Sequence, residues 1–193
     1  MIEDFQVFRN LNILEYFSAE EQNLIIQEIE IKELEKDEVL LKERTVCSHI
    51  WLVVSGSFYQ YRSTTNCRDD IFDLHIDGDF VLNHQSFISR KPSTYTIKAF
   101  EKSMVYQLSV DSIYKLTGIS QSFLKLGRLL EDKTSRARIG EMFQKPNKKY
   151  SYILHERPEL LQKFPQTMIA SYLQITPETL SRVRKRIFSL LKK

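Results

Sequence analysis

Residues 164–184 read FPQTMIASYLQITPETLSRVR, and this stretch decides how the rest of the chain is interpreted. Its apolar residues recur where two short helices joined by a tight turn need core contacts. They are Ile169, Leu173, Ile175, Leu180 and Val183. Ala170 is small where the two helices must approach closely. Thr176 is a good helix N-cap, and Pro177 is favoured at the first helical position. The stretch therefore predicts a helix-turn-helix.

The second predicted helix presents an outer face that is polar and basic. Its members are Pro177, Glu178, Ser181, Arg182 and Lys185. Such a face suits an element that lies in a DNA major groove. Gln174 stands in the turn where glycine is usual, because φ is often positive there. An ordinary helical hairpin with charged faces is the alternative, but the cap, the proline, the small residue and the charge together favour DNA binding.

Charge is distributed unevenly along the chain. The whole sequence carries a net charge of +3, whereas residues 145–193 carry +8 and residues 1–144 carry −5. A mildly acidic body joined to a basic segment indicates a regulatory part and a part that meets a polyanion. A solvated lysine-rich surface is the competing interpretation.

The region from about Ile31 to Ser109 consists of short β-branched and aromatic runs separated by turn residues. Residues 53–61 predict two strands that meet at Gly56, with turns at residues 63–66 and 77–79. Closely spaced strands without intervening helices indicate an antiparallel sandwich or barrel. Before this region, Ser18 and Glu21 have capping-box spacing and predict a short helix.

Helices are expected again after the strands. Asp111 and Ser112 begin a helical stretch that Gly118 interrupts, and Ser120 can cap a longer helix to about Phe143. Several apolar residues of this long helix share one face, as in an association seam, although packing on its own domain is the alternative. They are Phe123, Leu126, Leu130 and Ala137. Residues 146–149 predict a linker. We therefore expect a sensor domain over residues 1–115, a dimerisation helix over 116–145 and a DNA-binding domain over 146–193.

Composition and motifs argue against other classes. The longest apolar run, residues 50–54, is far short of the roughly 20 residues that a membrane helix needs, and the acidic start gives no sign of a signal peptide, so we expect a cytoplasmic protein. Cys47 and Cys67 are too few for a disulfide framework or a four-cysteine cluster. No His-x-His spacing supports a cupin-type metal site, and the few histidines form no haem motif. No nucleophile–base pair or glycine-rich phosphate loop indicates an enzyme, and no cofactor is expected with certainty.

Taken together, these features resemble those of the CRP/FNR family of bacterial transcription regulators, over nearly the whole chain. The strand pair at residues 50–61, the turn at 77–80, the long helix and residues 176–182 occur in the family's order. The resemblance implies an α+β fold, in which an antiparallel β-roll of the cyclic nucleotide-binding type is followed by a long helix and a C-terminal helix-turn-helix. It also implies a homodimer that binds an inverted repeat in double-stranded DNA, with RNA polymerase as a further partner.

The resemblance assigns roles to residues by position. Glu178 and Arg182 would read base edges, and Pro177 replaces a residue that is often a base-reading arginine. Phosphate contacts are implied for Gln166, Thr167, Thr176 and Thr179, and Ser181 and Lys185 complete the predicted interface. Other cations near the end serve general phosphate attraction or are solvated: Arg184, Arg186, Lys192 and Lys193. There is no room for the family's β-hairpin wing, so Phe188, Leu190 and Leu191 are expected to need cover within the domain.

The family's cyclic-nucleotide cassette would fall on residues 78–99. Its glycine-glutamate pair becomes Leu82-Asn83, its arginine becomes Ser93, and only the hydroxyl of Thr94 is retained. A buried phosphate needs a charged partner, so cyclic AMP is not expected to bind in the usual mode. Two interpretations are left for six polar residues: they line a pocket for an unknown small-molecule effector, or they take part in ordinary loop packing. They are Asn83, His84, Ser86, Ser93, Thr94 and Tyr95. A β-roll that senses a ligand and acts through a protein partner without DNA is the alternative function.

Overall fold

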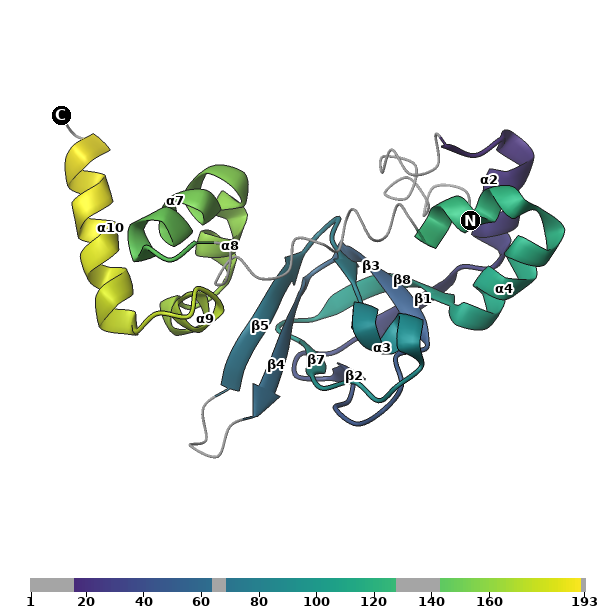
Figure 1. The fold of residues 1–193 in the computed structure, drawn as a ribbon, viewed down its shortest axis with the longest axis horizontal. Helices are drawn as coiled ribbons and strands as arrows, with labels where there is room; N and C mark the ends of the chain where they lie inside the picture. Colours follow the sequence, from purple (N-terminus) through teal and green to yellow (C-terminus); the bar gives the residue numbers. More distant parts are fainter. Residues whose placement is uncertain (1–15, 64–68, 128–142, 192–193) are drawn as a thin grey trace. The chain divides into compact units, whose positions relative to one another are not determined.

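The structure, a computed structural model, describes residues 16–63, 69–127 and 143–191. The chain divides into two compact units, the first made of residues 1–58 and 75–135 and the second of residues 59–74 and 136–193. Figure 1 shows the strands and helices that compose them. The predicted limits of the functional domains stay a prediction.

In the part of the chain that the structure describes, eight strands form two four-stranded sheets, with the strand orders β1-β8-β3-β6 and β2-β7-β4-β5. Their bounds are β1 Glu30–Leu34, β2 Val39–Leu41, β3 His49–Ser55, β4 Ser57–Ser63, β5 Asp69–Ile76, β6 Phe80–Val81, β7 Thr96–Ala99 and β8 Ser103–Ser109. In the first sheet β3 pairs antiparallel with β8, in a register that sets Ile50 opposite Leu108. The predicted antiparallel β-roll is confirmed.

The junction of β3 and β4 depends on Gly56, as the sequence predicted. Its φ is +100°, and a Cβ atom there would lie 2.2 Å from Ser103 Oγ. That hydroxyl accepts a hydrogen bond of 3.1 Å from the Ser57 N–H, so it cannot easily move away. Phe58 follows and is fully buried in the main core with Trp51 and Val105. Glycine therefore lets the chain pass from one sheet to the other without opening this core.

Within the described residues, four short helical segments belong to the first unit. They are α2 Ala19–Gln27, α3 His84–Ser89, α4 Val110–Ile119 and the 3₁₀ helix η3 Gln121–Leu124. The capping box is confirmed: Glu21 N–H donates to Ser18 Oγ at 3.2 Å, and Ser18 N–H donates to a Glu21 carboxylate oxygen at 3.0 Å. The predicted start and break of α4 are wrong. The helix begins at Val110, one residue before Asp111, with Ser109 as its cap, and it continues through Gly118 to Ile119.

Part of the predicted association seam packs inside the first unit. Phe123 and Leu126 are buried in a cluster with Phe17 and Ile25, and the Phe17 and Phe123 rings stack with centroids 5.7 Å apart. For these two residues the seam prediction is wrong, and packing on their own domain is observed. Ser120 caps η3, and Leu130 and Ala137 lie outside the described residues.

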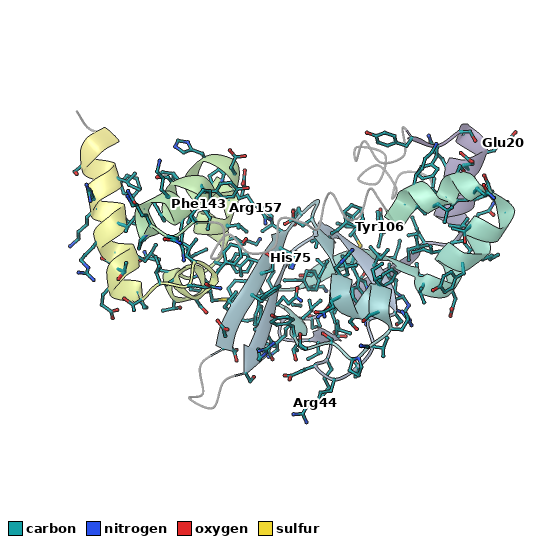
Figure 2. The ribbon with its side chains drawn as sticks, viewed as in Figure 1. Glu20, Arg44, His75, Tyr106, Phe143 and Arg157 are labelled. Carbon is teal, nitrogen blue, oxygen red and sulfur yellow. The ribbon has the colours of Figure 1, made fainter. Side chains whose placement is uncertain are left out.

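Four helices compose most of the second unit: α7 Pro146–Glu156, α8 Pro158–Lys163, α9 Gln166–Tyr172 and α10 Pro177–Leu191. The predicted linker at residues 146–149 is wrong, because Pro146 occupies the first helical position, where its missing N–H costs no hydrogen bond. Figure 2 labels Phe143, just before α7, and its ring packs against Tyr152 with centroids 5.4 Å apart. No helix in the described ranges is both long and apolar enough to span a bilayer.

Strand residues 69–74 belong to this second unit through contacts with its helices. Ser171 of α9 accepts a hydrogen bond of 2.9 Å from the Ile71 N–H and donates one of 3.3 Å to the Asp69 carbonyl. Arg157, at the end of α7, donates to the Leu74 carbonyl at 3.3 Å. These side chains satisfy backbone groups of β5, which stands at the edge of its sheet.

Candidate nucleic-acid interface

Helices α9 and α10 form where the sequence predicts the helix-turn-helix. Four of the predicted core positions are buried, Ile169, Ala170, Leu173 and Leu180, whereas Ile175 and Val183 are half-buried. Thr176 caps α10 through a hydrogen bond of 3.2 Å from the Thr179 N–H to its Oγ1. Pro177 is the first residue of the helix. The cap and the proline therefore act as expected, and they fix where α10 begins.

The turn between the two helices is a Schellman motif, in which the final carbonyls of a helix bond to N–H groups beyond its end. The Ile175 N–H donates to the Ala170 carbonyl at 3.0 Å, and the Gln174 N–H donates to the Ser171 carbonyl at 2.8 Å. Gln174 has a φ of +53°, which places it in the left-handed region where glycine is usual. The turn is thus formed despite a residue that disfavours it.

A buried lysine completes this turn. Lys149 of α7 is 6% exposed, and its Nζ donates a hydrogen bond of 2.9 Å to the carbonyl of Leu173, the C-cap residue of α9. A cation at a helix C-terminus also interacts favourably with the helix dipole. Lys149 was predicted only as part of a linker and of the basic charge, so sequence reasoning missed this role. We interpret it as a positioning residue for the turn that leads into α10.

The residues predicted to contact DNA lie on the surface of α9 and α10. All are exposed except Thr179, which is half-buried. They are Gln166 and Thr167 at the start of α9, Thr176 before α10, and Pro177, Glu178, Thr179, Ser181, Arg182 and Lys185 on α10. Each α-helical residue advances the side-chain direction by about 100°. Glu178, Arg182 and Lys185 therefore share one stripe of α10.

Arg182 folds back along its own helix. Its Nε donates to the Glu178 carbonyl at 3.4 Å, and its Nη2 donates to Thr179 Oγ1 at 3.3 Å. Both contacts are long and exposed, so they hold the guanidinium weakly. The side chain can exchange them for the O6 and N7 atoms of a guanine, which match the fork of an arginine.

The predicted effector residues lie in and around α3. Asn83 caps this helix by accepting from the Ser86 N–H at 2.9 Å, and it donates to Ser93 Oγ at 2.8 Å. The Ser93 hydroxyl donates onward to the Tyr95 carbonyl at 2.7 Å. Asn83, Ser86 and Ser93 are buried, Tyr95 is half-buried, and His84 and Thr94 are exposed. The structure thus joins the buried members through hydrogen bonds to one another and to nearby backbone.

Backbone groups of Cys47 extend this network. The Cys47 N–H donates to Ser86 Oγ at 2.9 Å, and Arg90 Nη1 donates to the Cys47 carbonyl at 2.9 Å. The guanidinium of Arg90, which belongs to the cassette residues 78–99, is therefore bonded to backbone. The Cys47 thiol itself is buried and donates to the His49 carbonyl at 3.3 Å.

Redox and metal chemistry find little support in the described ranges. Burial raises the pKa of the Cys47 thiol, and a protonated, enclosed thiol is a poor nucleophile. Cys67 lies outside the described residues. Within the part of the chain that the structure describes, no three His, Cys, Asp or Glu residues cluster in a way that could hold a metal ion.

Comparisons with known proteins agree with this architecture. The family model of the cyclic nucleotide-binding domain matches residues 31–118. An anaerobic regulatory protein of Haemophilus influenzae is 24% identical over 181 residues, which cover 82% of this chain and 67% of that protein. The structure of FixK2 from Bradyrhizobium japonicum has a TM-score of 0.68 at 20% identity, covering 84% of this chain and 85% of FixK2. A CooA variant from Carboxydothermus hydrogenoformans has a TM-score of 0.65 at 13% identity, covering 93% and 84%.

These comparisons confirm the resemblance to CRP/FNR-type transcription regulators, and the solved structures confirm the fold. The family match covers the β-roll and α4, whereas the helix-turn-helix lies outside it. The roles of individual residues in the interface and in the cassette stay predictions.

Proposed function

We propose that this chain, which has the fold of CRP/FNR-type regulators, is a homodimeric transcription regulator that binds a specific DNA sequence through α10. The observation that carries the proposal is the exposed polar and cationic stripe of Glu178, Arg182 and Lys185 on the second helix of a helix-turn-helix. An arginine recognises guanine through two hydrogen bonds, and a carboxylate can accept from the amino group of cytosine. The polar stripe therefore offers the chemistry that reading base edges requires.

The segment that precedes α10 supports the same proposal. Base contacts discriminate only if the helix is held at a defined angle and height in the groove. Three features restrain α10: the Thr176 cap, the Schellman turn at Gln174, and the Lys149 ammonium on the Leu173 carbonyl. A helix restrained in this way presents Glu178 and Arg182 in a reproducible geometry.

The proposed function involves no catalytic activity and no binding of cyclic AMP in the usual mode. A cyclic phosphate enclosed in the β-roll needs a charged partner, whereas Arg90 donates to the Cys47 carbonyl and Ser93 stands where the family has its arginine. If an effector exists, its chemistry differs. A regulator that binds chromosomal DNA works where that DNA lies, and we therefore place the protein in the cytoplasm.

Selection of bound fragments from a pool of random duplex DNA tests the proposed function. The full chain should enrich an inverted repeat whose half-sites lie about one helical turn, roughly 34 Å, apart. A double variant with Glu178→Ala and Arg182→Ala serves as the control and should enrich no sequence. Enrichment of a single, non-repeated site would contradict the homodimer, and failure to retain any duplex at low salt would overturn DNA binding and favour a protein partner.

A further inference from the structure

A groove runs between the start of α9 and residues 181–189 of α10. It has a volume of about 530 Å³ and is open to solvent. Six residues line it: Gln166, Ser181, Arg184, Lys185, Phe188 and Ser189. Gln166, Ser181 and Lys185 already belong to the predicted DNA interface, and Arg184 was assigned general phosphate attraction or a solvated charge. No DNA contact was predicted for Phe188 or Ser189.

Phe188 is the unusual member of this lining. Its side chain is 45% exposed, and every other phenylalanine that the structure describes is buried or half-buried. The expectation that Phe188 is covered within its own domain is therefore wrong for this residue. A half-exposed aromatic ring gains free energy when an apolar surface covers it. The groove thus combines an apolar wall with polar surroundings.

Cations flank the ring. The segment Arg182–Arg186 contains four basic residues, and Glu178 is the only acid of α10. Arg184 and Lys185 reach the groove itself, and neither takes part in an ion pair found within the described ranges. Gln166 adds an amide and Ser181 a hydroxyl, both of which can donate to phosphate oxygens. This donor set suits an anion with several acceptor oxygens.

The groove continues the predicted base-reading stripe around α10. At about 100° per residue, Ser181 and Lys185 border the direction of Glu178, and Phe188 and Arg184 follow on the same side. When a helix reads bases in a major groove, the sugar–phosphate backbone passes beside it. The surface adjacent to the stripe is therefore where that backbone would lie.

We propose that this groove binds the sugar–phosphate backbone of duplex DNA, with phosphates on Arg184 and Lys185 and the apolar face of a deoxyribose on Phe188. The proposal rests on the proposed function, and it extends the DNA interface along α10 beyond the residues that the resemblance assigns. A free phosphate or nucleotide presents the same chemistry. The openness of the groove and its continuity with the stripe favour a long, continuous ligand.

Fluorescence anisotropy with the duplex obtained by selection, over a series of salt concentrations, tests the proposal. Phe188→Ala should weaken binding about fivefold per half-site at every salt concentration, because half of a phenylalanine loses its cover in each protomer. The double variant Arg184→Gln, Lys185→Gln should reduce the slope of log affinity against log salt by about 1.8 per half-site, or about 3.6 for the homodimer on the whole duplex, since each phosphate contact contributes about 0.9. Ile88→Ala, at a 63% exposed residue of α3, is the matched control and should change neither quantity.

The outcomes separate the two proposals. If the wild-type chain binds no duplex, the proposed function fails. If it binds and both groove variants match the wild type, only the groove proposal is overturned. If Phe188→Ala lowers the unfolding temperature, a reduced slope of log affinity against log salt in the double variant still supports the phosphate contacts. Deoxyadenosine monophosphate should not compete with the duplex at millimolar concentration; saturable displacement of the duplex would show that the groove is a small-ligand site instead.

Discussion

The cassette around α3 and the outer face of α10 differ in the burial and the hydrogen-bond partners of their polar side chains. In the cassette Asn83 and Ser93 are buried and donate to neighbouring protein atoms. On α10 Glu178 and Lys185 face solvent, and Arg182 makes only long contacts to its own helix. A buried polar group must be bonded within the protein because losing its partner costs about 1–3 kcal/mol. An exposed group keeps its capacity for a partner.

This difference shows that a domain match does not by itself establish a ligand. The cyclic nucleotide-binding model covers residues 31–118 and therefore the whole cassette, yet the buried side chains of Asn83, Ser86 and Ser93 are hydrogen-bonded within the protein. The family match therefore indicates the β-roll fold, and the hydrogen bonds of the cassette help to stabilise that fold. The exposed polar stripe of Glu178, Arg182 and Lys185 lies on α10, in the segment that the match leaves out.

Arg182→Ala, on the outer face of α10, should have the largest effect. Losing a bidentate contact to guanine costs about 1–3 kcal/mol of discrimination in each half-site, so the preference for the selected duplex over a random one should fall about 5- to 150-fold per half-site. The unfolding temperature should not change, because the side chain is exposed. Competition gel shifts and a thermal melt measure the two quantities.

Arg186→Ala is the matched control, since this arginine is also exposed and lies on the same helix. It should weaken binding to all duplexes equally and leave the preference intact, as loss of general phosphate attraction does. If Arg186→Ala erased the preference and Arg182→Ala did not, base reading would belong to a different part of α10.

The sequence predicted α9 and α10 well because their signals are local. Thr176, Pro177 and Ala170 each act within a few residues of their own position. Lys149 could not be found in this way, since its partner Leu173 is 24 residues distant and only the packing of α7 brings them together. Pro146 was read as a helix breaker although it begins α7, because the same residue suits either position. Phe123 and Leu126 have a spacing that is the same for a dimer seam and for the core of their own unit.

Lys149→Met should destabilise the second unit and loosen the turn before α10. Methionine keeps the length and the apolar contacts of the side chain but leaves the Leu173 carbonyl without its donor. We expect a loss of about 1–3 kcal/mol in the free energy of unfolding, together with a lower preference for the selected duplex. Urea unfolding and competition gel shifts measure these effects.

Lys148→Met provides the control, because the neighbouring lysine is exposed and the substitution removes the same charge. It should leave both the unfolding free energy and the DNA preference near those of the wild type. Equal effects of the two variants would mean that net charge, rather than the bond to Leu173, accounts for the result.

Asn83→Ala tests the cassette, in which Asn83 and Ser93 are buried. It removes the cap of α3 and the bond to Ser93, so we expect a loss of about 1–2 kcal/mol in stability, mostly from the cap. Affinity for the selected duplex should not change at a temperature where the variant is folded. Gln85→Ala, at an exposed position of the same helix, is the control. Thermal melts with and without cyclic AMP complete the test: a melting temperature of the wild type that rises with cyclic AMP would contradict the structural role of the cassette.

Gln174→Gly should have the smallest effect and the opposite sign. Gln174 is held at a φ of +53°, where a residue with a Cβ atom pays about 1–2 kcal/mol and glycine does not. Glycine also gives the unfolded chain more freedom, which offsets part of the gain. A net stabilisation of about 0.5–1 kcal/mol, or roughly 2 °C in melting temperature, should remain. Gln174→Ala keeps the Cβ atom and should gain nothing, so equal stabilisation by both variants would point to the exposed amide rather than to the backbone. Because the Schellman bonds and Lys149 already hold this turn, relieving the strain should raise stability without changing which duplex the protein prefers.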